Sequence, residues 1–117
     1  MLDPVSTQLD RYLTLVSQRQ KLVASNIANA DTPGYKTQDF DFESQLHAAL
    51  QSPDDAAPAP PNISPVPGLR VKNDGNNVDL DREARLLSEN ALRFSMATNF
   101  LRSQLKDLHT AIQGGGQ

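Results

Sequence analysis

The sequence predicts a mainly α-helical chain, in which two long terminal helices form an antiparallel coiled-coil pair. A short middle helix, a Pro-rich flexible segment and a small β-hairpin lie between them. Three observations support this prediction: apolar residues recur at helical spacing near both ends, six of the eight prolines fall within residues 52–67, and only six of the 117 residues are aromatic. Because aromatic side chains supply the largest buried areas, this composition favours helices that bury their apolar faces against other chains. We divide the chain into residues 1–34, 35–78 and 79–117.

The first predicted helix covers about residues 2–30. Its apolar positions are spaced three and four residues apart, which is the period of one helix face, and Arg19 interrupts them. Pro4 fits the first turn, where its missing N–H has no helical partner to lose. Pro33 and Gly34 predict the end of the helix, because proline disfavours helical geometry in the preceding residue and glycine permits a sharp turn.

The middle part, residues 35–78, contains three predicted pieces. Apolar residues at helical spacing predict a short amphipathic helix over about residues 42–51. Residues 52–67 are rich in proline, alanine and aspartate, and we expect this segment to be irregular, and either mobile or extended. Residues 68–78 predict a small hairpin with its turn at residues 73–76, Asn-Asp-Gly-Asn.

The C-terminal part carries the strongest periodicity of the chain. Ten positions, which we call the seam, repeat at alternating spacings of four and three residues, and nine of them are apolar. The seam consists of Leu80, Ala84, Leu87, Ala91, Phe94, Thr98, Leu101, Leu105, Leu108 and Ile112. It predicts one helix over residues 79–113 with a coiled-coil face, capped at its start by Asp79 or Asp81. At 1.5 Å per residue this helix would be about 50 Å long, so we expect it to need partners.

Composition and charge exclude several classes of function. The net charge is −3 and no run of lysine and arginine occurs, so the basic footprint of a nucleic-acid-binding protein is missing. The absence of cysteine excludes disulfides, thiolate metal sites and cysteine nucleophiles. No apolar run approaches the roughly 20 residues of a membrane span. Residues 1–10 carry no basic residue, so we expect no cleaved Sec signal.

The residues that could carry catalysis or bind a metal lack the partners that such chemistry requires. His47 and His109 lie on separate predicted helices, without a second ligand at metal-binding spacing. Asp39, Asp41 and Glu43 alternate with phenylalanines, but no nucleophile or opposing carboxylate accompanies them. We therefore expect no enzymatic activity, no cofactor, no metal site and no small-molecule substrate.

The most specific segment is residues 24–35, Ala-Ser-Asn-Ile-Ala-Asn-Ala-Asp-Thr-Pro-Gly-Tyr. From its residues alone, we interpret this segment as a helix end. Asn29 or Asp31 would meet backbone groups exposed there, and Tyr35 would fold back and pack.

This segment resembles the signature of the flagellar axial proteins, in which a helix ends in Ala-x-Asn-Ile-Ala-Asn-x-x-Thr-Pro-Gly-Tyr. Phe-Asp-Phe at residues 40–42 and Gly-Asn-Asn-Val-Asp-Leu-Asp-Arg-Glu at residues 75–83 extend the likeness. The chain is also short, with no large inserted domain. Together these features resemble the flagellar basal-body rod protein family, and within it most closely the proximal-rod FlgB type.

The resemblance implies a structural subunit of the bacterial flagellar basal-body rod, whose terminal helices assemble into a hollow helical shaft that transmits motor torque. It implies that the partners are other copies of the chain, other rod proteins, the rod-base adaptor, the membrane ring and the flagellar type III export apparatus. The expected location is the periplasm-spanning rod, reached without a cleaved Sec signal. The acidic charge, small size and heptads leave one alternative, a soluble helical adaptor or secretion chaperone.

We expect the assembly interface to involve both terminal helices and the signature segment. The expected interface residues are Leu9, Tyr12, Val16, Val23, Asn26, Ile27, Asn29, Pro33, Gly34, Tyr35, Leu87, Ala91, Phe94, Leu101, Leu105, Leu108 and Ile112.

Overall fold

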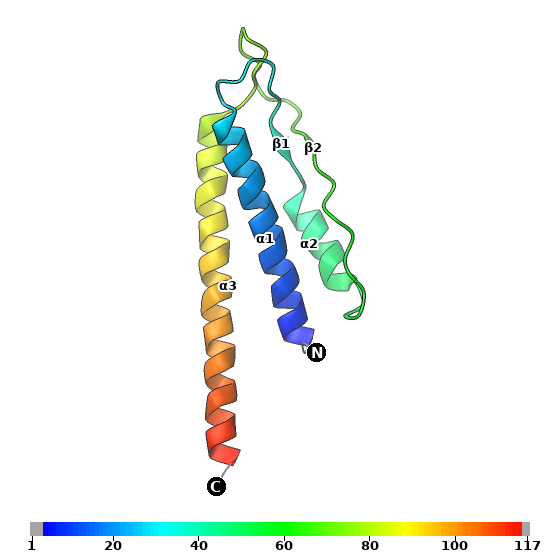
Figure 1. Ribbon diagram of the computed structural model, residues 1–117, viewed down its shortest axis with the longest axis vertical. Coiled ribbons are helices and arrows are strands. Elements are labelled where there is room, and N and C mark those ends of the chain that lie inside the picture. The colour runs from blue at the N-terminus through cyan, green and yellow to red at the C-terminus, as the bar shows by residue number, and fades with distance from the viewer. Residues whose placement is uncertain (1–3, 116–117) are drawn as a thin grey trace.

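The computed structural model describes residues 4–115, which fold into three helices and one two-stranded antiparallel sheet (Figure 1). The elements in chain order are α1 (Pro4–Ala28), β1 (Gln38–Asp39), α2 (Phe42–Gln51), β2 (Ser64–Pro65) and α3 (Leu80–Gly115). The molecule is elongated, with principal dimensions of 71 × 26 × 17 Å. The predicted mainly α-helical fold, with two long terminal helices and a short middle one, is confirmed.

The two terminal helices run in opposite directions (Figure 1). They lie together at the end of the molecule that carries the loop between α1 and β1, and they diverge toward the chain termini, where α3 extends past α1. Pro4 is the first residue of α1, as predicted, whereas Leu2 lies outside the described residues. Within residues 4–115, no helix is long and apolar enough to cross a membrane.

The ends of the helices follow local capping signals. α1 ends at Ala28, and the Asn29 side chain donates a 2.8 Å hydrogen bond to the backbone carbonyl of Ser25. Asp41 caps α2 by accepting from the backbone N–H of Ser44 at 3.2 Å. Asp79 caps α3 in the same way, since its Oδ1 accepts from two backbone N–H groups of the first turn at 3.0 and 3.3 Å.

The hydrophobic core lies between α1 and α2. Its buried members are Leu15, Val16, Phe40, Phe42 and Ala49. The Phe42 ring meets the Tyr12 ring edge-on at a centroid distance of 6.0 Å and stacks on Phe40 at 6.3 Å. The core therefore uses three of the six aromatic residues to attach the short helix to α1, and it leaves α3 outside.

The contact between α1 and α3 is more polar than the sequence suggested. The buried positions of the first part of α3 are Glu83, Leu86, Asn90 and Ala97, each one residue before a seam position. The seam itself is largely exposed: Leu87 is 39% accessible, Phe94 57% and Leu105 57%. The seam thus marks a long helix correctly, but α1 packs against a neighbouring face of that helix.

The predicted hairpin over residues 68–78 is wrong, although its turn is present. Lys72 and Asn76 pair through a 2.8 Å backbone hydrogen bond, but no strands follow. The sheet instead pairs β1 with β2, aligning Gln38 with Pro65 and Asp39 with Ser64. This places a strand inside the Pro-rich segment that we expected to be irregular. A proline is tolerated there because each strand of this sheet has only one neighbour.

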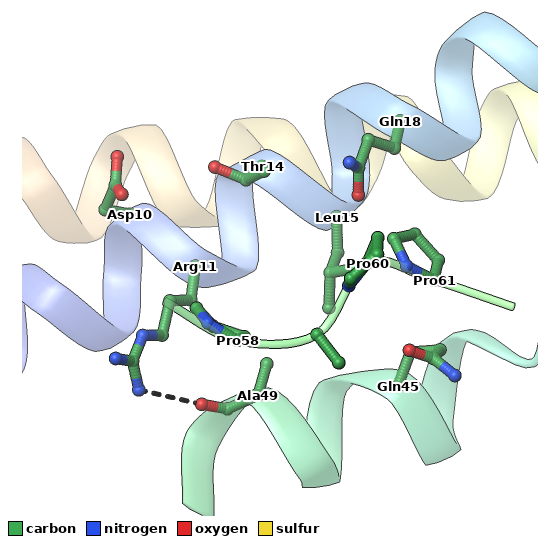
Figure 2. Close-up of a pocket in the computed structure, with 11 residues that line it drawn as sticks. Asp10, Arg11, Thr14, Leu15, Gln18, Gln45, Ala49, Pro58, Pro60 and Pro61 are labelled. Atoms are coloured by element: carbon green, nitrogen blue, oxygen red, sulfur yellow. Dashed lines mark hydrogen bonds between the residues drawn. The ribbon is translucent and has the colours of Figure 1, made fainter. Parts of the chain in front are cut away.

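The Pro-rich segment is tied to α1 by one arginine, shown in Figure 2. Arg11 is 7% exposed, and its guanidinium donates four hydrogen bonds to backbone carbonyls. The acceptors are Ala49 at 2.9 Å, Ser52 at 2.8 Å, Pro53 at 2.7 Å and Ala56 at 2.8 Å. The bond to Ala49 satisfies a carbonyl in the last turn of α2, and the other three hold the residues that follow the helix. As a result, the residues after Ala56, which include Pro58 and Pro60 in Figure 2, follow a defined path along α1.

Candidate functional site

The signature segment meets a second segment from far along the chain. The loop that follows α1 contacts the residues that precede α3, and together they close the end of the molecule where the two long helices meet (Figure 1). We call this region, residues 26–39 and 74–83, the junction. Backbone hydrogen bonds join its two halves: Gly34 N–H donates to Asp74 O at 2.9 Å, and Asn77 N–H donates to Tyr35 O at 3.2 Å.

Asn26 is the centre of the junction. Its side chain is buried in the last turns of α1 and makes four hydrogen bonds. Nδ2 donates to Gln38 O at 2.9 Å and to the Glu83 carboxylate, while Oδ1 accepts from Tyr35 Oη at 2.8 Å and Gln38 N–H at 3.1 Å. One amide therefore uses both its donor and its acceptor groups to connect α1, β1 and α3.

A chain of alternating charges continues from Glu83. Its carboxylate is fully buried and binds Arg82 at 2.7 Å, and Arg82 also binds Asp39 at 2.6 Å. Arg19 of α1 reaches the same Asp39 oxygen at 3.1 Å. Two positive and two negative groups thus neutralise one another in a mostly buried position. This explains why an arginine interrupts the apolar spacing of α1 at residue 19.

Two consecutive asparagines hold the loop that follows α1. Asn76, which is fully buried, donates from Nδ2 to the carbonyls of Asn29 and Thr32, both at 2.8 Å. Asn77 accepts from the backbone N–H and the hydroxyl of Thr37 at 2.7 and 2.9 Å. Residues that the sequence suggested were part of a hairpin turn are therefore the second half of the junction.

The backbones of the two halves approach each other at a pair of glycines. Gly34 and Gly75 have φ angles of +77° and +86°, in the left-handed region that favours glycine. A Cβ on Gly75 would lie 3.3 Å from the Cα of Gly34. Both conditions, the torsion angle and the close approach, therefore favour glycine at position 75.

Gly75→Ala is expected to lower the free energy of unfolding by about 2–3 kcal/mol, since backbone strain of about 1–2 kcal/mol adds to the crowding against Gly34. Gly68→Ala is the matched control, because Gly68 has a φ of +79° but no atom within 4 Å of the added Cβ. We expect it to cost only the strain. Urea unfolding followed by circular dichroism measures both variants, and equal losses would contradict the role given to the close approach.

Arg93 forms a second connection, farther along α3 from the junction. Its guanidinium lies 4.3 Å from the centre of the Phe42 ring and binds Glu43 at 2.9 Å and Glu89 at 3.2 Å. Burial alone would lower the pKa of Arg93, but hydrogen bonds with Tyr12, Glu43 and Glu89 outweigh that effect. The pKa is therefore raised above the ordinary arginine value. Arg93 thus joins α3 to the core that α1 and α2 form.

The expected interface residues fall into three groups. Buried within the chain are Val16, Val23 and Asn26, so in this conformation they contact residues of their own subunit. Partly buried are Leu9, Tyr12, Asn29 and Tyr35. Exposed are Ile27, Pro33, Gly34, Leu87, Ala91, Phe94, Leu101, Leu105, Leu108 and Ile112. The exposed group lies mainly on one stripe of α3.

The titratable groups considered for chemistry have structural roles or lie on the surface. Asp39 binds two arginines, Asp41 caps α2, and Glu43 pairs with Arg93. His47 and His109 are exposed on α2 and α3. Across the described part of the chain, no three His, Cys, Asp or Glu side chains gather in a way that could hold a metal ion.

Several residues that build the junction received no site role from the sequence, although four of them belong to the run that resembles the family. These are Thr37, Asn76, Asn77, Arg82 and Glu83. The available signal was the run Gly-Asn-Asn at residues 75–77, since adjacent asparagines after a glycine are poor strand residues.

Comparisons with known proteins identify the family. A family model described as flagella basal body rod protein matches residues 13–36, which end within the junction. The chain is 35% identical to the flagellar basal body rod protein FlgB of Escherichia coli (strain K12) and 38% identical to that of Salmonella typhimurium (strain LT2). Each match spans 98% of this chain and 99% of the relative. FlgB of Borrelia hermsii is 31% identical over 88% of this chain and 91% of the relative. Because these matches cover almost the whole chain, the protein belongs to the FlgB family of flagellar basal body rod proteins.

Proposed function

We propose that this rod subunit belongs to the proximal rod, and that its terminal helices assemble with those of neighbouring subunits into a hollow helical shaft that transmits motor torque. The observation that carries the proposal is the exposed seam of α3. Leu101, Leu105, Leu108 and Ile112 are 37–67% accessible, although they repeat with coiled-coil spacing. Exposed apolar stripes of this length mark surfaces that pack against other chains.

The junction supports the same proposal mechanically. α3 has 36 residues and is therefore about 54 Å long, so torque on its free end acts through a long lever. The buried bonds of Asn26 and Glu83 fix α1 to the first turns of α3. A subunit joined in this way presents two long helices at a set angle, as a stiff shaft requires.

The family indicates a structural component rather than an enzyme. The subunit's neighbours in the proposed shaft are copies of itself and other rod proteins. The rod-base adaptor and the membrane ring contact the base of the shaft. The flagellar export apparatus delivers the chain without a cleaved Sec signal, and no catalytic step or cofactor takes part. The names of its relatives place them in the basal body, and we infer the same location for this chain.

Purified basal bodies test the proposal. We expect an epitope-tagged chain to co-purify with rods, and a strain lacking the gene to be non-motile and to lack rods distal to this subunit. The tagged chain must restore swimming, which controls for the tag. A chaperone or adaptor would instead stay in the cytosol bound to an exported client. Fractionation that finds the chain there and not in basal bodies would contradict the proposal.

A further inference from the structure

The Pro-rich segment contains a stretch that few contacts hold in place. We call residues 52–63 the strap, which runs from the end of α2 to the start of β2, and none of its residues is buried. Pro58, Pro60 and Pro61 have no backbone N–H to donate. Among the described residues, the part from 57 to 63 makes no hydrogen bond with any group. Few buried contacts and few hydrogen bonds are the features of a segment that opens locally.

The strap crosses a space that it does not fill. A cavity of about 240 Å³ lies beneath it, between α1 and α2 (Figure 2). Leu15 lines the cavity from α1 and Ala49 lines it from α2, while the strap residues from Pro58 to Pro61 line it from a third side. Leu15 and Ala49 are each 6% exposed. The strap therefore covers these two apolar side chains, but it covers them loosely.

In the described structure, Arg11 supplies every hydrogen bond between the strap and α1. Its guanidinium donates to the carbonyls of Ser52, Pro53 and Ala56 at 2.7–2.8 Å. A fourth bond, to Ala49 O at 2.9 Å, joins it to the last turn of α2. No carboxylate of the described residues pairs with Arg11, so backbone carbonyls alone offset its charge. Because opening the strap breaks three of these bonds and returns the charge to water, one side chain sets the balance between the closed and open forms.

Other contacts hold the elements on either side of the strap. Phe42 fixes α2 in the core, and the Arg93 guanidinium lies 4.3 Å from the centre of its ring. The pairing of β1 with β2 fixes the chain after the strap, and Val66 N–H donates to Thr37 O at 2.9 Å. Both ends of the strap can therefore stay in place while the part between them lifts.

We propose that the strap is a cover that opens and closes over the cavity between α1 and α2 while the helices stay packed, and that Arg11 is the latch of the closed form. The closed form hides Leu15 and Ala49, and the open form adds them to the surface of the subunit. This device belongs to the single subunit and does not depend on the proposed rod function. A lysine cannot replace the latch, because its donors share one nitrogen, whereas Arg11 uses two nitrogens to reach four carbonyls.

Thiol labelling of the purified full-length chain measures the opening, because the chain has no cysteine of its own. Ala49→Cys places one thiol beneath the strap, and Ala30→Cys, at a residue 8% exposed in the junction, is the matched control. Excess maleimide labels both. We expect Ala49→Cys to react faster, and Arg11→Lys to accelerate its reaction about tenfold or more, since each hydrogen bond lost from a charged group is worth about that factor. The reaction of Ala30→Cys should keep its rate.

The result that would overturn the inference is an unchanged rate for Ala49→Cys, or equal acceleration at both positions, since Arg11 would then stabilise the whole fold. Hydrogen exchange at the amides of α2 provides a second readout. It should stay slow in Arg11→Lys, and faster exchange throughout α2 would mean that the helix leaves with the strap, which also contradicts the proposal.

Urea provides a test that leaves Arg11 intact, and it decides the question even if Arg11→Lys does not fold. Below the unfolding transition, labelling of Ala49→Cys should rise little with urea, because lifting the strap exposes little surface. Labelling of Ala30→Cys should rise steeply. The same urea dependence at both positions would show that the strap opens only when the whole chain unfolds, and would overturn the inference.

Discussion

Replacing Asn26 with alanine is expected to lower the free energy of unfolding by about 3–5 kcal/mol, the usual cost of breaking a buried, charged hydrogen-bond pair. The change leaves a fully buried Glu83 oxygen without its amide donor. It also removes the bonds that Asn26 makes with the Tyr35 hydroxyl and with the backbone N–H and C=O of Gln38, and leaves Tyr35 only a longer contact of 3.5 Å with the Ser25 hydroxyl. Thermal and urea unfolding, followed by far-ultraviolet circular dichroism, measure the loss.

Asn99→Ala is the matched control for that experiment. Asn99 is also a helical asparagine, but it is exposed on the part of α3 beyond α1. An exposed substitution of this kind usually changes stability by no more than about 0.5 kcal/mol. If Asn26→Ala were as mild as Asn99→Ala, Asn26 would not be the centre of the junction.

Leu105→Asp and Leu101→Asp are expected to abolish incorporation into the rod, and with it swimming, while export continues. Both residues are exposed in the subunit, so neither change should disturb its fold. In an assembled rod, the new carboxylate would be buried against apolar side chains of a neighbour, at a cost of several kcal/mol. Motility in soft agar and immunoblots of purified basal bodies measure the effect, and immunoblots of the secreted fraction measure export.

Ser103→Asp provides the control for charge alone. Ser103 is exposed on the same stretch of α3 and lies about 200° around the helix from Leu105, so it adds the same carboxylate away from the seam. We expect normal swimming. Unchanged motility in both leucine variants would remove the seam from the proposed interface.

Local signals predicted the helices well. Pro4 and Asp79 each act within one turn of the residue they affect, so their roles could be predicted from the neighbouring sequence. Asn29 also meets a backbone carbonyl at the end of α1, as expected. Such short-range hydrogen bonds depend little on the rest of the fold.

Features that depend on distant residues could not be predicted in this way. Asn26 binds Glu83, which is 57 residues away, and the sequence around either residue does not indicate the other as its partner. The hairpin prediction failed for the same reason: Asn76 and Asn77 bond to the loop after α1, which removes them from a strand pair. Periodicity located the seam but did not show which face of α3 meets α1.

The polar contact between α1 and α3, set beside the apolar seam, separates the forces of folding from those of assembly. Ion pairs and amide hydrogen bonds hold Asn26, Arg82 and Glu83 together, whereas the burial of Leu105 and Leu108 would wait for a neighbour. Hydrophobic association near room temperature is driven by entropy and weakens on cooling. Growth of a shaft through this surface should therefore absorb little heat, show a negative heat-capacity change and slow in the cold, while each free subunit keeps its shape.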